Sequence, residues 1–233
     1  MSKTFLIVGG NSGMARATVS RLVDQGHEVI CAARTPGEWE MDSRVSLLPF
    51  RAEDPEFSGE LPGQLDGMAY FPGTIQLKPF RSLKDEDFRQ EWEINFLGAV
   101  RVLRAAYGPL KKAERSSVVL FSTVAVQTGM GFHASIASAK GAVEGLTRSL
   151  AAEWSPTIRV NAIAPSLTDT PLASSLLDTE AKREAAEGRH PSKSVGSPEE
   201  LAELVTFLLG DGSQFLTGQI LPVDGGLSSV KVF

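Results

Sequence analysis

The chain has 233 residues, of which 42% are hydrophobic and 22% charged, as expected of a globular protein with one large core. Its formal net charge of -5 argues against nucleic acid as a partner, because such binding depends on clustered lysine and arginine. The single cysteine, Cys31, excludes an intramolecular disulfide and a cysteine-based metal site. We therefore expect a cytoplasmic protein without a bound metal.

A short apolar run, a glycine-rich turn and a helical pattern open the chain. Residues 4–8 predict a strand, glycines between positions 9 and 13 interrupt it, and apolar residues at helical spacing follow until Gly26. The apolar run is far shorter than the about 20 residues that span a membrane, and it leads directly into the turn. We therefore expect neither a signal peptide nor a membrane partner.

Strand-like and helix-like segments alternate along the rest of the chain. Continuously apolar runs predict strands at residues 28–33, 45–50, 67–71, 117–122, 158–163 and 219–223. Helical periodicity predicts helices at residues 85–112 and 136–154, and after Ser197, where Ser-Pro-Glu-Glu forms a capping box. The inward stripe of the 136–154 helix is predicted to be Ala139, Ala142, Val143, Leu146 and Leu150. Residues 172–191, acidic and rich in alanine, predict a mobile helical lid.

This order of elements predicts one domain over residues 1–233, because no linker or charge block divides the chain. Strands without a polar face are typical of parallel sheets that are covered on both sides. The predicted fold class is α/β, a Rossmann-type doubly wound parallel sheet of about seven strands in a three-layer α/β/α arrangement. Ligands of such sheets bind at the carboxyl ends of the strands.

The glycine-rich turn lies between the first strand and the first helix, where backbone amides and the helix dipole can bind a pyrophosphate. Gly9 permits a sharp turn, Gly13 lets phosphates approach the backbone, and Ala15 permits close packing of the helix on the strand. A turn whose glycines serve conformation alone is the alternative. The expected cofactor contacts in this segment are Gly9, Asn11, Ser12, Gly13 and Met14.

Several segments in the same order resemble the short-chain dehydrogenase/reductase family along nearly the whole chain. Gly-x-x-x-Gly-x-Ala is close to its glycine signature, and Asn95 in EINFLGAV and Lys140 in SAKGAVEGLTRSLAAEW match its active-site asparagine and lysine. Residues 159–173 resemble its segment after the sixth strand, and residues 216–226 resemble its closing strand and turn. The resemblance implies hydride transfer between a nicotinamide cofactor and a small carbonyl, alcohol or activated double bond. It also implies nicotinamide contacts from Pro165, Thr168 and Thr170, and a homo-oligomer, either tetramer or dimer.

Cofactor choice depends on the end of the second predicted strand, where an acidic residue favours NAD and a cation favours NADP. Ala33 stands where NAD-preferring relatives have aspartate, and Arg34 follows, as in relatives similar to the NADP-preferring type. A guanidinium can bind a phosphate bidentately, although Arg34 could also be merely solvated. Arg51 replaces an aspartate of many relatives, and Ala52 after it is a further expected contact. NADP is the predicted cofactor, with NAD left open.

The catalytic pattern of the family is broken in this chain. Its Tyr-x-x-x-Lys motif places a tyrosine four residues before the lysine, and here that residue is Ile136, which can donate no proton. The serine of the family corresponds to Thr123, whose hydroxyl could orient a carbonyl. His133 is a substitute acid if the helix begins early enough for residues 133, 136 and 140 to share a face; otherwise it is a loop residue.

A second departure follows the fourth predicted strand, where the usual Asn-Asn-Ala-Gly is Tyr70-Phe71-Pro72-Gly73. We expect Tyr70, Pro72 and Gly73 beside the cofactor. Glu93, Glu144 and Glu153 are interpreted as surface charges of helices. Two functions remain open: an NADP-dependent oxidoreductase whose proton comes from His133, Thr123 or water, and a non-catalytic NADP(H)-binding sensor or regulatory protein in which Lys140 and Asn95 hold the cofactor.

Overall fold

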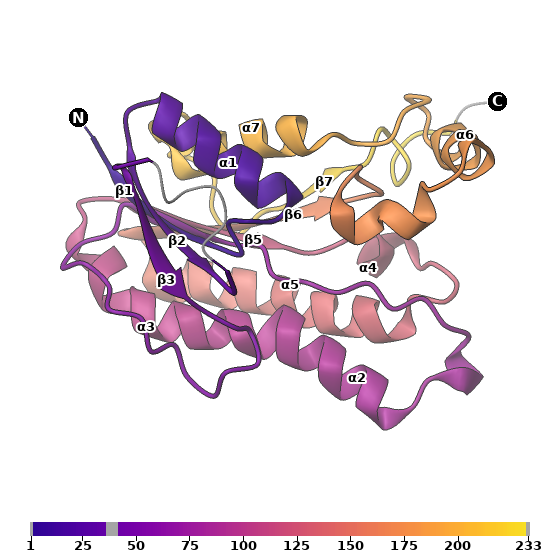
Figure 1. Cartoon of the computed structure of the whole chain (residues 1–233), viewed down its shortest axis with the longest axis horizontal. Helices are drawn as coiled ribbons and strands as arrows, with labels where there is room; N and C mark the ends of the chain where they lie inside the picture. Colours follow the sequence, from indigo (N-terminus) through magenta and orange to yellow (C-terminus); the bar gives the residue numbers. More distant parts are fainter. Residues whose placement is uncertain (1, 36–41, 232–233) are drawn as a thin grey trace.

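The computed structural model describes residues 2–35 and 42–231, and these form one α/β architecture (Figure 1). Seven parallel strands make a single sheet in the order β3-β2-β1-β4-β5-β6-β7. The strands are β1 Thr4–Val8, β2 Glu28–Ala33, β3 Val45–Pro49, β4 Gly67–Tyr70, β5 Ser116–Phe121, β6 Ile158–Pro165 and β7 Ile220–Val223. The predicted Rossmann-type α/β fold is confirmed.

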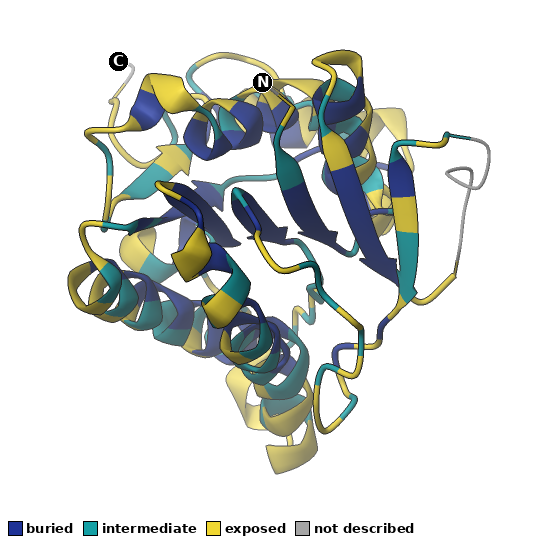
Figure 2. Ribbon diagram, turned by 90° about the vertical axis from the view of Figure 1, so that its left-hand side faces the viewer, coloured by how far each residue is buried: buried dark blue, intermediate teal, exposed yellow. Residues whose placement is uncertain are grey.

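Helices cover both faces of the sheet, as Figures 1 and 2 show. One face carries α1 Gly13–Asp24 and α7 Pro198–Leu209, and the other carries α2 Asp85–Trp92, α3 Gly98–Lys112 and α5 Ala134–Trp154. The short α4 Ala125–Thr128 and the separate α6 Glu180–Arg189 follow the ends of strands. No helix among residues 2–35 and 42–231 is long and apolar enough to cross a bilayer.

Successive strand residues enter opposite cores, since strand side chains alternate between the two faces. Leu6 and Met68 pack with the α3 and α5 side chains, whereas Phe5, Ile7 and Ala69 pack with those of α1 and α7. This two-sided burial is why the strands read as continuous apolar runs.

Helix ends follow their local sequence signals. In α7, Ser197 Oγ accepts from the Glu200 amide at 3.1 Å and the Ser197 amide donates to Glu200 Oε2 at 3.1 Å, so the predicted capping box is confirmed. The chain turns out of α1 at Gly26, whose φ of 82° requires glycine, and the amides of Gly26 and His27 bind carbonyls of the last helical turn.

Two helix predictions are confirmed, each with a feature that the sequence pattern did not indicate. The helical stretch predicted over residues 85–112 is present, and it includes a π-helical turn, Glu93–Leu97, between α2 and α3. Of the predicted inward stripe of α5, Ala139 and Val143 are buried, Leu146 and Leu150 pack against the core, and Ala142 is only partly buried. The inward face of α5 also includes three buried polar residues that apolar spacing does not indicate, namely Lys140, Glu144 and Thr147.

The register of the strand pairing places the carboxyl ends of β1, β2 and β4 side by side. Val8 pairs with Ala32 of β2 and with Tyr70 of β4. The glycine turn, the segment after Ala33 and the segment after Tyr70 therefore leave the sheet at the same edge, where a doubly wound sheet binds its ligands.

Candidate functional site

The glycine turn lies against two other segments at the carboxyl edge of the sheet. Gly9 has a φ of 82°, and a Cβ there would lie 3.1 Å from Pro72 Cδ. A Cβ on Gly13 would lie 3.0 Å from Thr170 Cγ2. Both glycines thus allow close approaches that a side chain would block, and the fold brings together the predicted positions Gly9, Gly13, Pro72 and Thr170.

The amino end of α1 is not capped by its own N-cap side chain. Ser12 is the N-cap residue, but its hydroxyl donates to the carbonyl of Gly9 at 2.9 Å. The first turn, which includes Gly13 and Met14, has no acidic residue. Amides at the start of an uncapped helix can bind an anion.

The end of β2 presents a cation. Arg34 is exposed and makes no hydrogen bond or ion pair with another described residue, and Asn11 reaches across the turn to bind the Thr35 carbonyl. Arg51, after β3, is also exposed. Ala52 is buried, and its carbonyl accepts from Arg101 at 3.1 Å, so this residue faces the α3 side.

The segment after β4 connects the core to the site. Tyr70 is buried and its hydroxyl donates to the Ile94 carbonyl at 2.8 Å, while burial raises the pKa of this phenol above its usual range. Its hydroxyl is therefore used inside the core. Three residues later, a Cβ on Gly73 would lie 3.1 Å from Asn95 Oδ1 and 3.6 Å from Lys140 Nζ. Gly73, Asn95 and Lys140 converge at one point.

Lys140 presents a buried ammonium at this point. The residue is 8% exposed, and burial lowers its pKa to about 8, an effect that the charge of Glu91 opposes. No described residue accepts a hydrogen bond from Lys140 Nζ or lies within ion-pair distance of it. A buried group without a partner is uncommon and marks a place where a ligand can supply one.

Asn95 is fixed by a network that includes a buried carboxyl. Its Nδ2 lies 2.8 Å from both Thr74 Oγ1 and Glu91 Oε2, and its Oδ1 accepts from the Thr74 amide at 3.4 Å. The Thr74 hydroxyl donates to the same Glu91 oxygen. No sequence motif marked Glu91. The signal that could have found it is its position four residues before Asn95, on the same face of the helix.

The three remaining candidates on the catalytic side lie near the start of α5. Thr123 is half-buried and its hydroxyl accepts from the Ala125 amide at 3.3 Å, while Ile136 is buried. The helix begins only at Ala134, so His133 is its N-cap residue and lies outside the helical face that includes positions 136 and 140. The His133 Nδ1 donates to the Gly131 carbonyl at 2.7 Å.

The segment after β6 lies over the glycine turn. The Pro165 carbonyl accepts from Val124, and the hydroxyls of Thr168 and Thr170 donate to carbonyls of the same loop. The 3-10 helix Pro171–Leu176 and α6 follow, drawn in orange in Figure 1, so the segment predicted as a lid is helical. Glu144, interpreted from sequence as a surface charge, is in fact 5% exposed, because it accepts from Ser122 Oγ at 2.8 Å.

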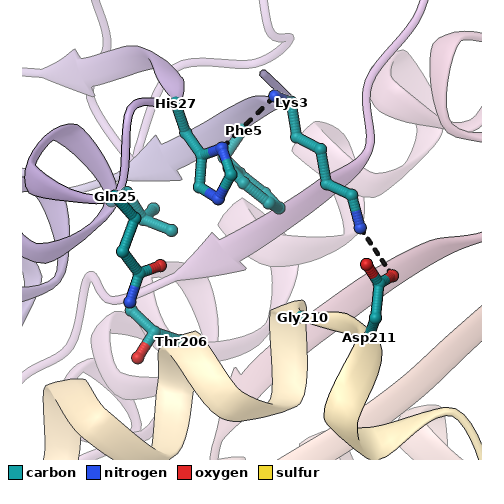
Figure 3. A pocket seen from close by; sticks show the side chains of 8 residues that line it. Lys3, Phe5, Gln25, His27, Thr206, Gly210 and Asp211 are labelled. Atoms are coloured by element: carbon teal, nitrogen blue, oxygen red, sulfur yellow. Dashed lines mark hydrogen bonds and ion pairs between the residues drawn. The ribbon is translucent and has the colours of Figure 1, made fainter. Parts of the chain in front are cut away.

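A hollow of about 520 Å³ lies at the opposite edge of the sheet, before β1 and β2 and beside the end of α7 (Figure 3). It is lined by Lys3, Phe5, Leu22, Gln25, His27, Thr206, Gly210 and Asp211. None of the predicted site residues belongs to it.

Comparison with known proteins places this chain among oxidoreductases. A family model described as enoyl-(acyl carrier protein) reductase matches residues 56–228. A tropinone reductase homolog of Arabidopsis thaliana is 34% identical over 240 residues, covering 96% of this chain and 92% of the relative. The matched region of the family model contains every strand from β4 to β7 and all the helices from α2 to α7.

Two solved structures resemble the fold closely. The ligand-free aldohexose dehydrogenase of Thermoplasma acidophilum has a TM-score of 0.88 at 25% identity, covering 100% of this chain and 96% of that one. ElxO with NADP bound has a TM-score of 0.87 at 24% identity, covering 99% of this chain and 100% of that one. The likeness therefore extends over the whole sheet and its helices.

Proposed function

The chain belongs to the short-chain dehydrogenase/reductase family and is an oxidoreductase, and from this premise we propose that it uses NADP(H) with an atypical proton donor. Its substrate is a small carbonyl or alcohol, or an activated double bond. The observation that carries the proposal is the ammonium of Lys140, buried and unpartnered among the described residues, 3.6 Å from where a Cβ of Gly73 would lie.

The residues at the carboxyl edge fit a dinucleotide. Gly9 and Gly13 let the turn pack closely against Pro72 and Thr170, and the uncapped start of α1 provides amide donors for a pyrophosphate. Lys140 and Asn95 would hold the nicotinamide half, with Pro165, Thr168 and Thr170 beside it. When bound, the reduced nicotinamide supplies the hydride.

The preference for NADP(H) over NAD(H) rests on the exposed Arg34 at the end of β2, with Arg51 adding positive charge from the end of β3. A guanidinium that has no partner among the described residues can bind a 2′-phosphate bidentately. ElxO, of the same fold, has been solved with NADP bound, which is in keeping with this choice.

An atypical proton donor follows from Ile136, which stands four residues before Lys140 and is buried. Thr123 would orient the substrate oxygen through its hydroxyl. His133, Thr123 and water are the donors that the sequence suggested. Because His133 Nδ1 binds the Gly131 carbonyl, only its Nε2 would be available for proton exchange.

Ile136 also supports a second candidate function, a sensor or regulatory protein that binds NADP(H) without turnover. In this alternative Lys140 and Asn95 serve binding alone. Under either function we propose a cytoplasmic protein of one domain, residues 1–233, that forms a dimer or tetramer. A hollow of about 410 Å³ between α2 and α5, lined by Phe88, Trp92 and Ala139 among others, suits contact with a second copy.

The two functions separate in one experiment. NADPH is titrated by fluorescence, and its oxidation is then followed against aldehydes, ketones, quinones and enones for the parent, His133→Ala and Lys140→Ala. The enzyme requires turnover above background that Lys140→Ala abolishes. Binding without turnover on any substrate would favour the sensor, and turnover unaffected by His133→Ala would remove that residue from the mechanism.

A further inference from the structure

Glu91 is a buried carboxyl that the proposed chemistry does not yet use. It is 1% exposed and lies on α2, which packs against α5. Its Oε2 accepts from Asn95 Nδ2 at 2.8 Å and from the Thr74 hydroxyl, whereas its Oε1 has no hydrogen-bond partner among the described residues. Burial raises the pKa of Glu91, and its hydrogen bonds and the charge of Lys140 oppose that rise.

Glu91 and Lys140 are the two buried charges at the same point of the site. Asn95 joins them in space, because it binds Glu91 through Nδ2 and lies beside Gly73, where the Lys140 ammonium also lies. They do not form a contact ion pair, so the lysine keeps its donors free while it lies in the field of the carboxylate.

Several other charged groups on the elements around α5 form ion pairs. The pairs are Asp87 with Lys78, Arg89 with Asp85 and Glu86, Glu93 with Arg101, and Glu144 with Arg148. Glu91 is the only charge found to act on the titration of Lys140 among the described residues.

We propose that Glu91 is the counter-charge that keeps the Lys140 ammonium protonated, and that Lys140 thereby serves as the proton donor to the substrate oxygen. Lys140 is then the catalytic residue and Glu91 a positioning residue that acts through it. This inference rests on the proposed oxidoreductase function, and it supplies an acid where position 136 has none.

The proton step balances with the cofactor named above. In the reduction of a carbonyl, the carbon receives a hydride from the reduced nicotinamide, and the oxygen receives a proton from Lys140. The N–H bond of the ammonium breaks, its electron pair remains on Nζ, and an O–H bond forms on the substrate. Lys140 regains its proton from solvent.

The test measures the titration of Lys140 directly. In protein without cofactor, labelled with ¹³C at lysine Cε, the resonance missing from Lys140→Met is assigned to Lys140 and followed from pH 6 to pH 11. The parent is expected to titrate at about 8. Glu91→Gln should lower that midpoint by about one pH unit or more, because removing an opposite charge disfavours the ammonium. Glu91→Asp, which keeps the charge, should titrate closer to the parent.

A matched control and a second readout separate charge from structure. Glu93→Gln removes a carboxylate two residues away that is paired with Arg101, and it should leave the Lys140 midpoint unchanged. Far-UV circular dichroism confirms that each variant is folded. The reduction rate should fall as pH rises through the Lys140 midpoint, and Glu91→Gln should move that fall to lower pH.

The inference and the proposed function fail in different ways. If Glu91→Gln and Glu91→Asp both titrate at the parent midpoint, or if Glu93→Gln shifts it equally, Glu91 is not the counter-charge. If NADPH is oxidised with a pH profile that Glu91→Gln does not move, Lys140 is not the donor, although the oxidoreductase stands. If NADPH does not bind, the proposed function itself is lost, whatever Lys140 titrates at.

Discussion

The two edges of the sheet differ in how their charges are satisfied. At the amino edge, the hollow of Figure 3 holds Lys3 and Asp211, whose Nζ and Oδ1 atoms are 2.6 Å apart, and His27 accepts from the Lys3 amide at 3.3 Å. At the carboxyl edge, Lys140 is more deeply buried and has no such partner among the described residues. The edge with this hollow has paired charges, and the other edge has an unpaired one.

This difference teaches that an unpaired charge and a hollow need not lie at the same edge of the sheet. Keeping an ammonium buried without a partner costs stability, and the low pKa of Lys140 reflects that cost. The pKa of Asp211 is also lowered, but for the opposite reason. The hydrogen bond from Lys3 stabilises the charged form of Asp211, whereas burial disfavours the charged form of Lys140. The buried charge at the carboxyl edge therefore destabilises the fold, as is common at functional sites, whereas the ion pair at the amino edge stabilises it slightly.

The largest expected effect comes from replacing a lysine by methionine at one edge and, as a control, at the other. Lys140→Met should reduce NADPH-dependent turnover by at least about 100-fold, the usual contribution of a positioned acid. Lys3→Met removes a lysine from the other edge and should leave turnover within about twofold, since it lies far from the reacting groups. Steady-state kinetics on both variants measure the contrast. Equal losses would mean that the edges do not differ in function.

A smaller effect tests the cofactor end of the carboxyl edge. Arg34→Ala should weaken NADPH binding by about 10- to 100-fold, the range for loss of a charge-assisted hydrogen bond. NADH lacks the 2′-phosphate, so its affinity should stay the same and serves as the control within each protein. Fluorescence titration with both nucleotides gives the ratio. An unchanged NADPH affinity would mean that Arg34 is solvated and does not bind the 2′-phosphate.

The smallest effect concerns stability at the amino edge. Asp211→Asn should destabilise the fold by less than about 1 kcal/mol at pH 7, because the ion pair with Lys3 is largely exposed. The pKa of Asp211 is lowered in the folded state, so its contribution exists above the unfolded value and is lost as pH falls through the folded one. Denaturant unfolding at pH 7 and pH 3 should show the difference between parent and variant shrinking. A difference that grows on acidification would contradict this sign.

Much of the fold could be predicted because its signals are local. Continuous apolar runs gave each of the strands to within two residues, and the Ser197 capping box and Gly26 marked helix ends that the structure reproduces. The π-turn at 93–97 carried no such signal, since Asn95 and its neighbours have ordinary helical spacing. The buried polar stripe of α5 depends on partners distant in sequence, such as Ser122 for Glu144.

The candidate site was predictable in part for the same reason. Gly9, Gly13 and Lys140 belong to motifs, and the fold brings the segments that contain them to one edge. The hydroxyl of Tyr70 binds the carbonyl of Ile94, and this contact depends on where the π-helical turn lies relative to β4. The predicted role of His133 depended on the residue at which α5 begins, and helix ends are the least certain feature of a sequence-based prediction. Glu91 became visible only through its contacts with Thr74 and Asn95.

Calorimetric titration of NADPH into the parent protein tests the central claim most directly, because every proposed role depends on a dinucleotide lying between the glycine turn and Lys140. We expect saturable binding of one NADPH per chain at submillimolar concentration, with NADH weaker. If neither nucleotide binds to the folded protein at millimolar concentration, the carboxyl edge is not a dinucleotide site, and both the enzyme and the sensor are excluded.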